Sequence, residues 1–286
     1  MAEEVYNFQT DLTKLDLNSN SYNGENALFF ADCSKLAYES QETIKQVITE
    51  QLDFNNFRFF DVGKSTQAFI AGNDKMIIVV FRGTQEIGDF FKDAELKLKD
   101  DLVGKVHQGF RTSLNEVWDN NVKDQDMHQF IAQCQDNNQS IWFCGHSLGA
   151  ALATLAAAEY ALNGNNSDVE AVKGIYTIGQ PRVGNRKFAK GFDAILAEKC
   201  FRTVNNNDVV AKIPLPGILF KYAHVGQEIY IDCYGKLQHS IPWWEKIRNQ
   251  FRGIQMDFGD IGIDALEDHG SEGYVNLIKE NRKVIF

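Results

Sequence analysis

Apolar residues along this 286-residue chain form short runs that alternate with longer amphipathic or alanine-rich stretches. The short runs predict strands, and the longer stretches predict helices, after an irregular polar arm that reaches about Asn26. The expected strands are Gln67–Ala71, Met76–Phe81, Ile141–Cys144, Gly174–Ile178, Cys200–Val204 and Glu228–Cys233. The expected helices are Ala27–Gln41, Arg111–Gln135, Leu148–Leu162, Asn185–Glu198 and Glu272–Glu280.

The order of these elements indicates an α/β fold. Strands that alternate with helices predict a mainly parallel central sheet covered by helices on both faces. The first two strands are separated by the turn-forming sequence Gly72-Asn73-Asp74, which predicts a hairpin. Functional sites in such sheets gather at the carboxyl ends of the strands.

Composition favours one domain, spanning residues 1–286, because the chain has only four prolines, no repeat and no linker-like tract. Its apolar runs are too short to cross a bilayer, so no transmembrane segment is expected. A formal net charge of −10 argues against a nucleic-acid partner and is compatible with a neutral ester or acylglycerol substrate. No pattern indicates an oligomeric state.

The chain begins MAEEVYNFQT, which is acidic and lacks the apolar region of a signal peptide. Its five cysteines are scattered, without CxxC spacing, which favours free buried thiols over a disulfide framework or a metal site. A cytoplasmic location is therefore expected, although the mature form of a secreted protein would begin in the same way.

The most informative motif is GxSxG at Gly145–Gly149, in the segment SIWFCGHSLGAA. It follows an entirely apolar strand and precedes an alanine-rich helix, which is the context of a strand-turn-helix nucleophile elbow. A serine hydroxyl needs such a turn, an adjacent base and N–H donors for an oxyanion before it can attack a carbonyl at neutral pH. Ser147 is therefore the candidate nucleophile, and no metal or organic cofactor is needed.

The partners of the serine are sought in the order nucleophile, acid, histidine, which is the chain order of α/β-hydrolases. His269 lies on a Gly-containing loop just before the last helix and is the expected base. His146 is expected to point away from the site, His224 to be structural, and His239 to lie in a polar loop. Asp208 follows the strand Cys200–Val204 and is the expected acid. Rival acids lie near the histidine, at Asp257, Asp260, Asp264, Glu267 and Asp268.

Two N–H donors are expected to hold the oxyanion. One is Leu148, at the start of the helix that follows the serine, where the helix dipole also favours negative charge. The other is Thr84, in the loop after the strand Met76–Phe81. Apolar residues that follow Asp208 are candidates for an acyl-binding groove: Ile213, Leu215, Ile218, Leu219 and Phe220.

Taken together, several motifs resemble the class 3 lipases, the family of fungal triacylglycerol lipases and feruloyl esterases. They are FRGT (Phe81–Thr84), VHQGF (Val106–Phe110), GHSLGA (Gly145–Ala150), GQPRVGN (Gly179–Asn185), the NND turn with Pro214 and the stretch Asp268–Tyr274. They occur in family order from about residue 60 onward. The resemblance implies an α/β-hydrolase fold, a Ser147–Asp208–His269 triad and the oxyanion pair Thr84 and Leu148.

The resemblance also implies a lid directly after the oxyanion residue, at residues 85–95. Here Ile87, Phe90 and Phe91 follow helical spacing with charged residues opposite. A closed lid would bury these side chains, and a lipid surface would let it open, which implies a transient contact with lipid. A helix docked permanently on the core remains the alternative. An insertion at 238–267 carries tryptophans and basic residues at helical spacing, typical of an interfacial helix or second lid, and equally of a helix packed on the core or a dimer partner.

The sequence thus predicts a serine carboxylester hydrolase, and most directly a lipase acting on acylglycerol esters. Triad residues do not separate a lipase from a phospholipase A1 or a feruloyl-type esterase, because all three share the chemistry. A lipase-like scaffold without catalysis is the alternative from another class.

Overall fold

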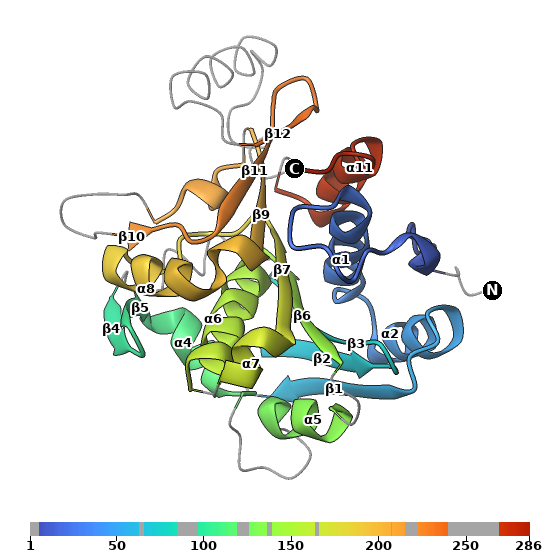
Figure 1. The fold of residues 1–286 in the computed structure, drawn as a ribbon, viewed down its shortest axis with the longest axis horizontal. Helices are drawn as coiled ribbons and strands as arrows, with labels where there is room; N and C mark the ends of the chain where they lie inside the picture. Colours follow the sequence, from blue (N-terminus) through green and yellow to red (C-terminus); the bar gives the residue numbers. More distant parts are fainter. Residues whose placement is uncertain are drawn as a thin grey trace.

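An eight-stranded mixed sheet runs through the centre of the computed structural model (Figure 1). The structure describes residues 6–62, 66–84, 97–118, 126–135, 139–163, 166–206, 208–214, 222–239 and 269–286. In hydrogen-bonded order the strands are β1 (Asn56–Val62), β2 (Thr66–Gly72), β3 (Met76–Phe81), β6 (Ser140–His146), β7 (Val172–Ile178), β9 (Cys200–Asn205), β11 (Gln227–Ile231) and β12 (Leu237–His239).

The middle of the sheet is parallel and its edges are antiparallel. Strands β3, β6, β7, β9 and β11 pair in parallel. Strands β1 and β2 add antiparallel pairs at one edge, and β12 adds one at the other. The predicted hairpin is confirmed, because β2 and β3 pair antiparallel with Gly72 opposite Ile77. The carboxyl ends of the parallel strands therefore meet at one edge, where chemistry is expected.

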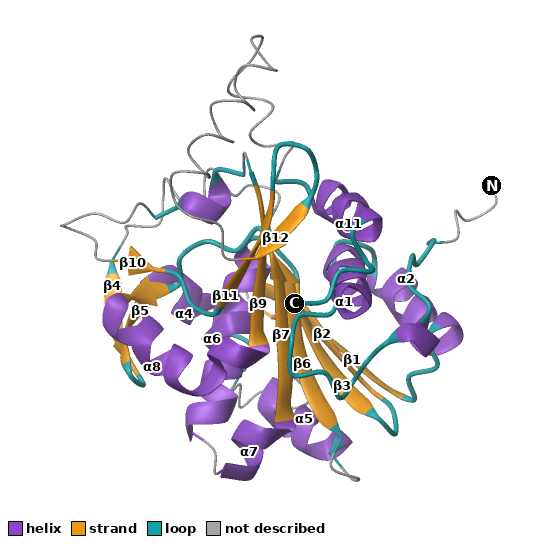
Figure 2. Ribbon diagram, turned by 45° about the horizontal axis from the view of Figure 1, so that its top comes forward, coloured by secondary structure: helices purple, strands orange, loops and turns teal. Residues whose placement is uncertain are grey.

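Helices cover both faces of this sheet (Figure 2). One face carries α1 (Gly24–Leu36), α2 (Gln41–Gln46) and α11 (Ser271–Glu280). The other carries α4 (Gln108–Asn115), α5 (Met127–Cys134), α6 (Leu148–Asn163), α7 (Asn166–Ala171) and α8 (Arg186–Leu196). Consecutive residues of β3 pack into opposite cores: Ile77 and Val79 face the α6 side, while Ile78 and Val80 face the α1 side. Burial of both faces explains why this strand is apolar throughout.

A small second sheet stands beside the main one. It joins β10 (Tyr222–Ala223), β8 (Gly184–Asn185), β5 (Gly104–His107) and β4 (Leu98–Asp101). Its strands have two to four residues, too few for an alternating pattern to mark them in the sequence. Four short helical turns complete the described elements: Leu12–Lys14, Val47–Gln51, Ala197–Lys199 and Val210–Lys212.

The single long helix predicted for Arg111–Gln135 is wrong. The described residues of this segment fall in two helices: α4 ends at Asn115, and α5 begins at Met127. Each has its own N-cap. His107 Nδ1 accepts from Phe110 N–H at 3.3 Å, and Asp126 Oδ1 accepts from Gln129 N–H at 2.7 Å. Asp126 therefore marks the start of a separate helix, and the helical spacing of apolar residues in α4 and in α5 belongs to separate elements.

The first long helix begins earlier than the sequence indicates. Asn23 caps α1, since its side-chain oxygen accepts from the N–H groups of Glu25 and Asn26 at 2.9 and 3.1 Å. The N-terminal arm thus ends at Asn23 and contains one short helical turn capped by Asp11. Within the described ranges, no helix has both the length and the apolar content needed to span a bilayer.

Candidate active site

Ser147 occupies a tight turn between β6 and α6. Its backbone has φ of +59°, a left-handed conformation that costs a side-chain-bearing residue about 1–3 kcal/mol. The turn is held by the Ser147 N–H, which donates to Ile178 O at 3.1 Å, and by Ser147 O, which accepts from Ala150 N–H at 3.0 Å. A Cβ on Gly149 would collide with the Phe81 carbonyl, so only glycine lets α6 approach the end of β3 this closely. The local structure is that of a nucleophile elbow.

Asp208 lies just beyond the carboxyl end of β9, with its carboxylate fully buried. Oδ1 accepts from the N–H groups of Val210 and Ala211, at 2.8 and 3.3 Å. Oδ2 accepts from the Tyr274 hydroxyl at 2.6 Å and from His269 Nδ1 at 2.9 Å. Every bond satisfies the charged form of this carboxylate, which is how a buried carboxylate avoids a large desolvation cost.

His269 precedes α11 and lies against the elbow. Its ring centroid is 4.6 Å from that of His146, the residue before Ser147. Gly179, with φ of +62°, packs directly against the His269–Asp208 pair: a Cβ there would stand only 2.8 Å from His269 Cε1 and 3.0 Å from Asp208 Oδ2, too close for either to stay in place. Three residues distant in sequence, His146, Gly179 and Asp208, therefore converge on this imidazole.

Hydrogen bonding fixes the protonation pattern of the pair. Burial alone would raise the pKa of the Asp208 carboxyl, but the hydrogen bonds from His269 and Tyr274 and the charge of His269 outweigh it, and the pKa is lowered. An ionised carboxylate only accepts, so His269 Nδ1 carries the proton. In the neutral ring Nε2 is then the nitrogen with a free lone pair.

Two buried polar atoms at this place have no hydrogen-bond partner among the described residues: Ser147 Oγ and His269 Nε2. The side chains of Ser147, Asp208 and His269 are all buried, at 0%, 0% and 5% exposed. A buried orphan donor and acceptor cost free energy, and this arrangement is typical of groups kept ready for a reaction. Chemically, an imidazole with a free Nε2 can take a hydroxyl proton, and a buried carboxylate on Nδ1 can stabilise the cation that results.

The loop that follows β3 lies beside Ser147. A Cβ on Gly83 would stand 3.2 Å from Ser147 Cβ and would collide with His146 O and the Tyr38 hydroxyl. Thr84 is the next residue and is half-buried. Leu148 begins α6, so its N–H lies in the first turn and has no carbonyl acceptor within the helix. Of the two predicted oxyanion residues, Leu148 thus follows the serine directly, and Thr84 follows the glycine that packs against the serine.

Sequence reasoning missed four residues that hold this site together: Tyr38, His146, Gly179 and Tyr274. Gly179 and Tyr274 fall inside the motifs GQPRVGN and Asp268–Tyr274, so the motifs marked their positions without indicating their contacts. His146 was expected to point away from the site, which is wrong, since its Nε2 lies 2.6 Å from His269 O. Tyr38 belongs to no motif, and nothing in the sequence pattern marks it.

The other positions predicted from the sequence lie partly inside and partly outside the described residues. His239 is in β12 rather than a polar loop, and its ring stacks on Phe286 with centroids 5.3 Å apart. Ile213 is half-buried, and its carbonyl accepts from Arg182 N–H at 2.8 Å. Outside the described residues lie the groove candidates Leu215, Ile218, Leu219 and Phe220, the lid residues Ile87, Phe90 and Phe91, and positions 240–267 of the insertion.

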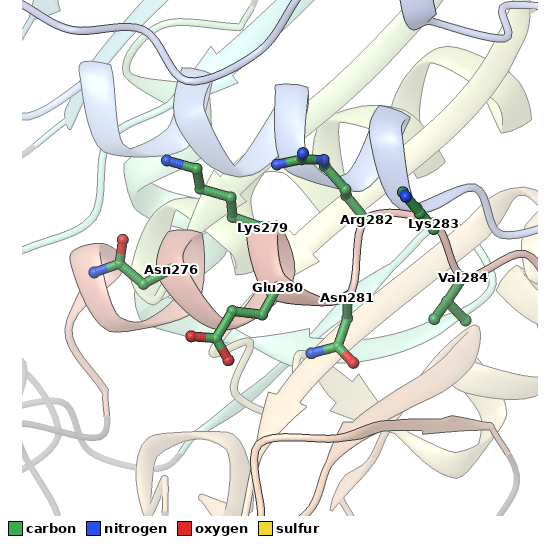
Figure 3. Close-up of a pocket in the computed structure, with 7 residues that line it drawn as sticks. All are labelled: Asn276, Lys279, Glu280, Asn281, Arg282, Lys283 and Val284. Carbon is green, nitrogen blue, oxygen red and sulfur yellow. The ribbon is translucent and has the colours of Figure 1, made fainter.

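A polar groove of about 830 Å³ runs along the end of α11, away from this cluster (Figure 3). Lys279 and Arg282 project from it towards α1, where Arg282 Nε lies 3.7 Å from Glu25 Oε1. The remaining lining residues are Asn276, Glu280, Asn281, Lys283 and Val284. None of Ser147, Asp208 and His269 lines it, so we assign this groove no part in the chemistry.

Comparison with known proteins agrees with the geometry. Residues 78–217 match the model of the family described as lipase (class 3). The chain is 27% identical over 86% of its length to the triacylglycerol lipase OBL1 of Arabidopsis thaliana, and 37% identical over 75% to phospholipase A1-II 4 of Oryza sativa subsp. japonica. It spans 63% and 59% of those two proteins, which is less than two thirds of either.

The fold is shared with solved lipase structures. A lipase from Rhizopus microsporus var. chinensis superposes with a TM-score of 0.55 at 25% identity, covering 74% of this chain and 76% of that one. The parallel core of the sheet, the elbow after β6 and helices on both faces are the features of an α/β-hydrolase fold. By the match over residues 78–217 and by its fold, the chain is similar to the class 3 lipases.

Proposed function

We propose that this protein is a serine carboxylester hydrolase that cleaves acylglycerol esters through an acyl-enzyme. The observation that carries the proposal is the buried Asp208–His269 hydrogen bond of 2.9 Å beside a serine in an elbow of φ +59°. A merely structural serine and histidine would gain stability from satisfied polar groups. Here Ser147 Oγ and His269 Nε2 are left without partners in the described parts of the chain.

In the proposed reaction, Ser147 Oγ attacks the ester carbonyl while His269 Nε2 takes the hydroxyl proton. Asp208 keeps the imidazole in the Nδ1–H form and stabilises the imidazolium. The tetrahedral intermediate collapses when His269 gives its proton to the leaving alcohol. Water, deprotonated by the same nitrogen, then attacks the acyl-enzyme, and the fatty acid leaves as Ser147 regains its proton.

The proposed oxyanion donors are the N–H groups of Leu148 and Thr84, with the Thr84 hydroxyl as a further donor. Support comes from their positions, one opening α6 and the other one residue after the Gly83 contact with Ser147. The loss of one donor typically costs about 3–4 kcal/mol in the transition state. Thr84→Val, which removes only the hydroxyl, is expected to lower kcat and leave KM nearly unchanged.

A second candidate function is phospholipase A1 activity. It is favoured by one observation: the match to the rice phospholipase A1 has the higher identity, 37% against 27% for the Arabidopsis triacylglycerol lipase. The two functions share the triad chemistry and differ in the polar group that the site must accept next to the ester.

Emulsified triolein, dioleoylglycerol and dioleoylphosphatidylcholine, assayed by fatty-acid release at equal interfacial area, test the assignment. Ser147→Ala is the control. Turnover of the glycerides with little on phosphatidylcholine supports the lipase, and the reverse supports the phospholipase. Release from none of the three, by a folded protein, would contradict both.

The predicted lid at 85–95 has its own test. Rates on p-nitrophenyl esters from acetate to palmitate are measured below and above the solubility of each ester. A lid that opens on lipid predicts a jump in rate above solubility. A smooth saturating curve through that point would count against it.

A further inference from the structure

A chain of hydrogen bonds joins Tyr38, which packs against the loop after β3, to the main chain of His269. It begins at the Tyr38 hydroxyl, to which Gly83 lies so close that a Cβ there would collide with it. That hydroxyl lies 2.8 Å from His146 Nδ1, and His146 Nε2 lies 2.6 Å from the carbonyl oxygen of His269. The contacts therefore link the proposed oxyanion loop, the residue before the nucleophile and the residue that carries the base.

The direction of each bond follows from the chemistry of its atoms. A carbonyl oxygen only accepts, so His146 Nε2 must carry a proton and donate to His269 O. Burial lowers the pKa of His146 to about 3, helped by the neighbouring charge of His269, so the ring is neutral at ordinary pH. A neutral ring protonated on Nε2 offers Nδ1 as an acceptor, and the Tyr38 hydroxyl must therefore donate to it.

Other side chains pack closely around these hydrogen bonds. Among the described residues, Tyr38, His269, Asp208 and Tyr274 are titratable groups near His146. The guanidinium of Arg82 lies over the Tyr38 ring at 5.4 Å from its centroid, and it works against the effect of burial on the pKa of the Tyr38 hydroxyl. The close approach of Gly83 to Tyr38 and Ser147 leaves no room for a side chain there. The Tyr38 end of the chain of hydrogen bonds is thus enclosed by Arg82 and by Gly83.

We propose that Tyr38 and His146 are positioning residues that set the main chain of His269 relative to Ser147 and the oxyanion loop. This inference rests on the proposed function. Asp208 holds the imidazole ring of His269, and His146 holds its backbone, so the two contacts together fix where Nε2 points. Neither Tyr38 nor His146 touches substrate in this assignment. A displacement of a reacting group by about 1 Å can cost about 100-fold in rate, which is the scale on which such a hold matters.

Tyr38→Phe is the first test, because it removes one hydroxyl and keeps the ring. We expect kcat to fall about 10-fold or more with KM changed less than about 2-fold, since the loss is in geometry and not in substrate binding. Tyr160→Phe is the matched control: its buried hydroxyl also donates one side-chain hydrogen bond, to Gln135 Oε1 at 2.9 Å, but far along α6. It should leave kcat unchanged. Equal effects of the two variants would overturn the proposal.

A pair of conservative variants gives the second test. His146→Gln keeps an N–H donor near the place of Nε2, whereas His146→Asn has the same amide one bond shorter and does not reach His269 O. We expect His146→Gln to retain a kcat about 10-fold above that of His146→Asn. Equal kcat values in two folded variants would contradict a role for the Nε2 donor. If neither folds, Tyr38→Phe decides the matter.

Nitrogen NMR of histidine-labelled protein tests the hydrogen bonds without reference to activity. Wild-type His146 should be the neutral Nε2–H form throughout pH 5–9, and Tyr38→Phe should shift the His269 signals while Tyr160→Phe leaves them in place. A protonated or Nδ1–H His146, or His269 signals that ignore Tyr38, would overturn the proposal even in an active enzyme. If the wild type hydrolyses no ester but shows these signals, the proposed function fails while the hydrogen-bonded chain stands.

Discussion

The Tyr274 hydroxyl donates a 2.6 Å hydrogen bond to Oδ2 of Asp208, the same carboxylate oxygen that His269 Nδ1 contacts at 2.9 Å. The same hydroxyl accepts from the N–H of Asn205 at 2.9 Å, at the end of β9. Tyr274 therefore ties α11 to the strand that presents the acid. It also gives the buried carboxylate one of the bonds that keep it ionised.

Tyr274→Phe should weaken both stability and turnover. The variant leaves a buried N–H and a buried carboxylate one partner short, which should lower the free energy of unfolding by about 1–3 kcal/mol. We expect kcat to fall about 10-fold, because Asp208 orients His269 less firmly. Tyr160→Phe should lose stability alone. Denaturant unfolding and initial rates measure the two effects, and an unchanged kcat would show that Tyr274 does not act on the pair.

The stability cost of Tyr274→Phe should depend on pH. Because the pKa of folded Asp208 is lowered, its ionisation stabilises the fold above the unfolded pKa near 3.8, and this contribution is lost as pH falls through the lower folded pKa. In the variant, the fold lowers the pKa of Asp208 by a smaller amount. The difference in unfolding free energy between wild type and variant should therefore be largest at neutral pH and shrink below about pH 4. A difference that stays constant with pH would contradict the assigned role of the hydroxyl.

Asp208→Asn should preserve the fold and nearly abolish turnover. The side-chain oxygen still accepts from Val210 and Ala211, but an amide facing His269 no longer favours the Nδ1–H form. The rate should fall by about 1,000-fold or more. Rates of ester hydrolysis measure the loss of turnover, and a circular dichroism spectrum tests whether the variant is folded. Retention of more than a tenth of wild-type kcat would mean that another acid serves His269.

Gly179→Ala should damage the site, and Gly235→Ala provides a matched control. Both glycines have positive φ, +62° and +73°, so alanine strains the backbone by about 1–3 kcal/mol at either position. Only at position 179 would the new methyl group press on His269 and Asp208. We expect similar losses in thermal stability and a fall in kcat for Gly179→Ala alone. If both variants keep wild-type kcat, the backing role of Gly179 is wrong.

The buried Asp32 of α1 should make the fold less stable as pH rises. Burial raises its pKa to about 6, although its Oδ2 accepts from Gln9 N–H and the Thr10 hydroxyl at 2.7 and 3.2 Å. A folded pKa above the unfolded value means that the folded state holds the proton more tightly. The stability that Asp32 contributes is then present below about pH 4 and lost as pH rises through about 6.

Asp32→Asn removes this titration and can still accept the two hydrogen bonds. Relative to wild type, the variant should therefore gain stability between pH 4 and pH 7, by up to about 3 kcal/mol. Urea unfolding at several pH values measures the gain. A relative stability that does not change over this range would mean that Asp32 titrates normally.

The elements predicted most closely are those whose pattern of apolar residues matches their burial in the fold. Strand β3, apolar throughout because both faces are buried, and the elbow at Ser147 were predicted closely. The pair Asp208 and His269 followed from chain order and from the strand before the acid. These features are local or ordered along the chain, so one sequence suffices to find them.

Contacts between distant segments could not be predicted. Tyr38 and His146 are 108 residues apart, and nothing in the pattern of either segment requires their hydrogen bond. The two-residue strands β8 and β10 exist only because β10 pairs with β8 and β8 pairs with β5. The division of Arg111–Gln135 into two helices was missed although the cap that starts the second one, Asp126 Oδ1 accepting from Gln129 N–H, is local. Helical spacing of apolar residues does not record such breaks.

The central claim is that Ser147 is a nucleophile activated by His269, and covalent labelling tests it most directly. The wild type is incubated with a fluorophosphonate, digested and analysed by mass spectrometry, with Ser147→Ala and His269→Gln beside it. We predict one adduct per chain, located on Ser147, no adduct in Ser147→Ala and labelling slowed at least about 100-fold in His269→Gln. A folded wild type that remains unlabelled, or an adduct on any other residue, would contradict the assignment.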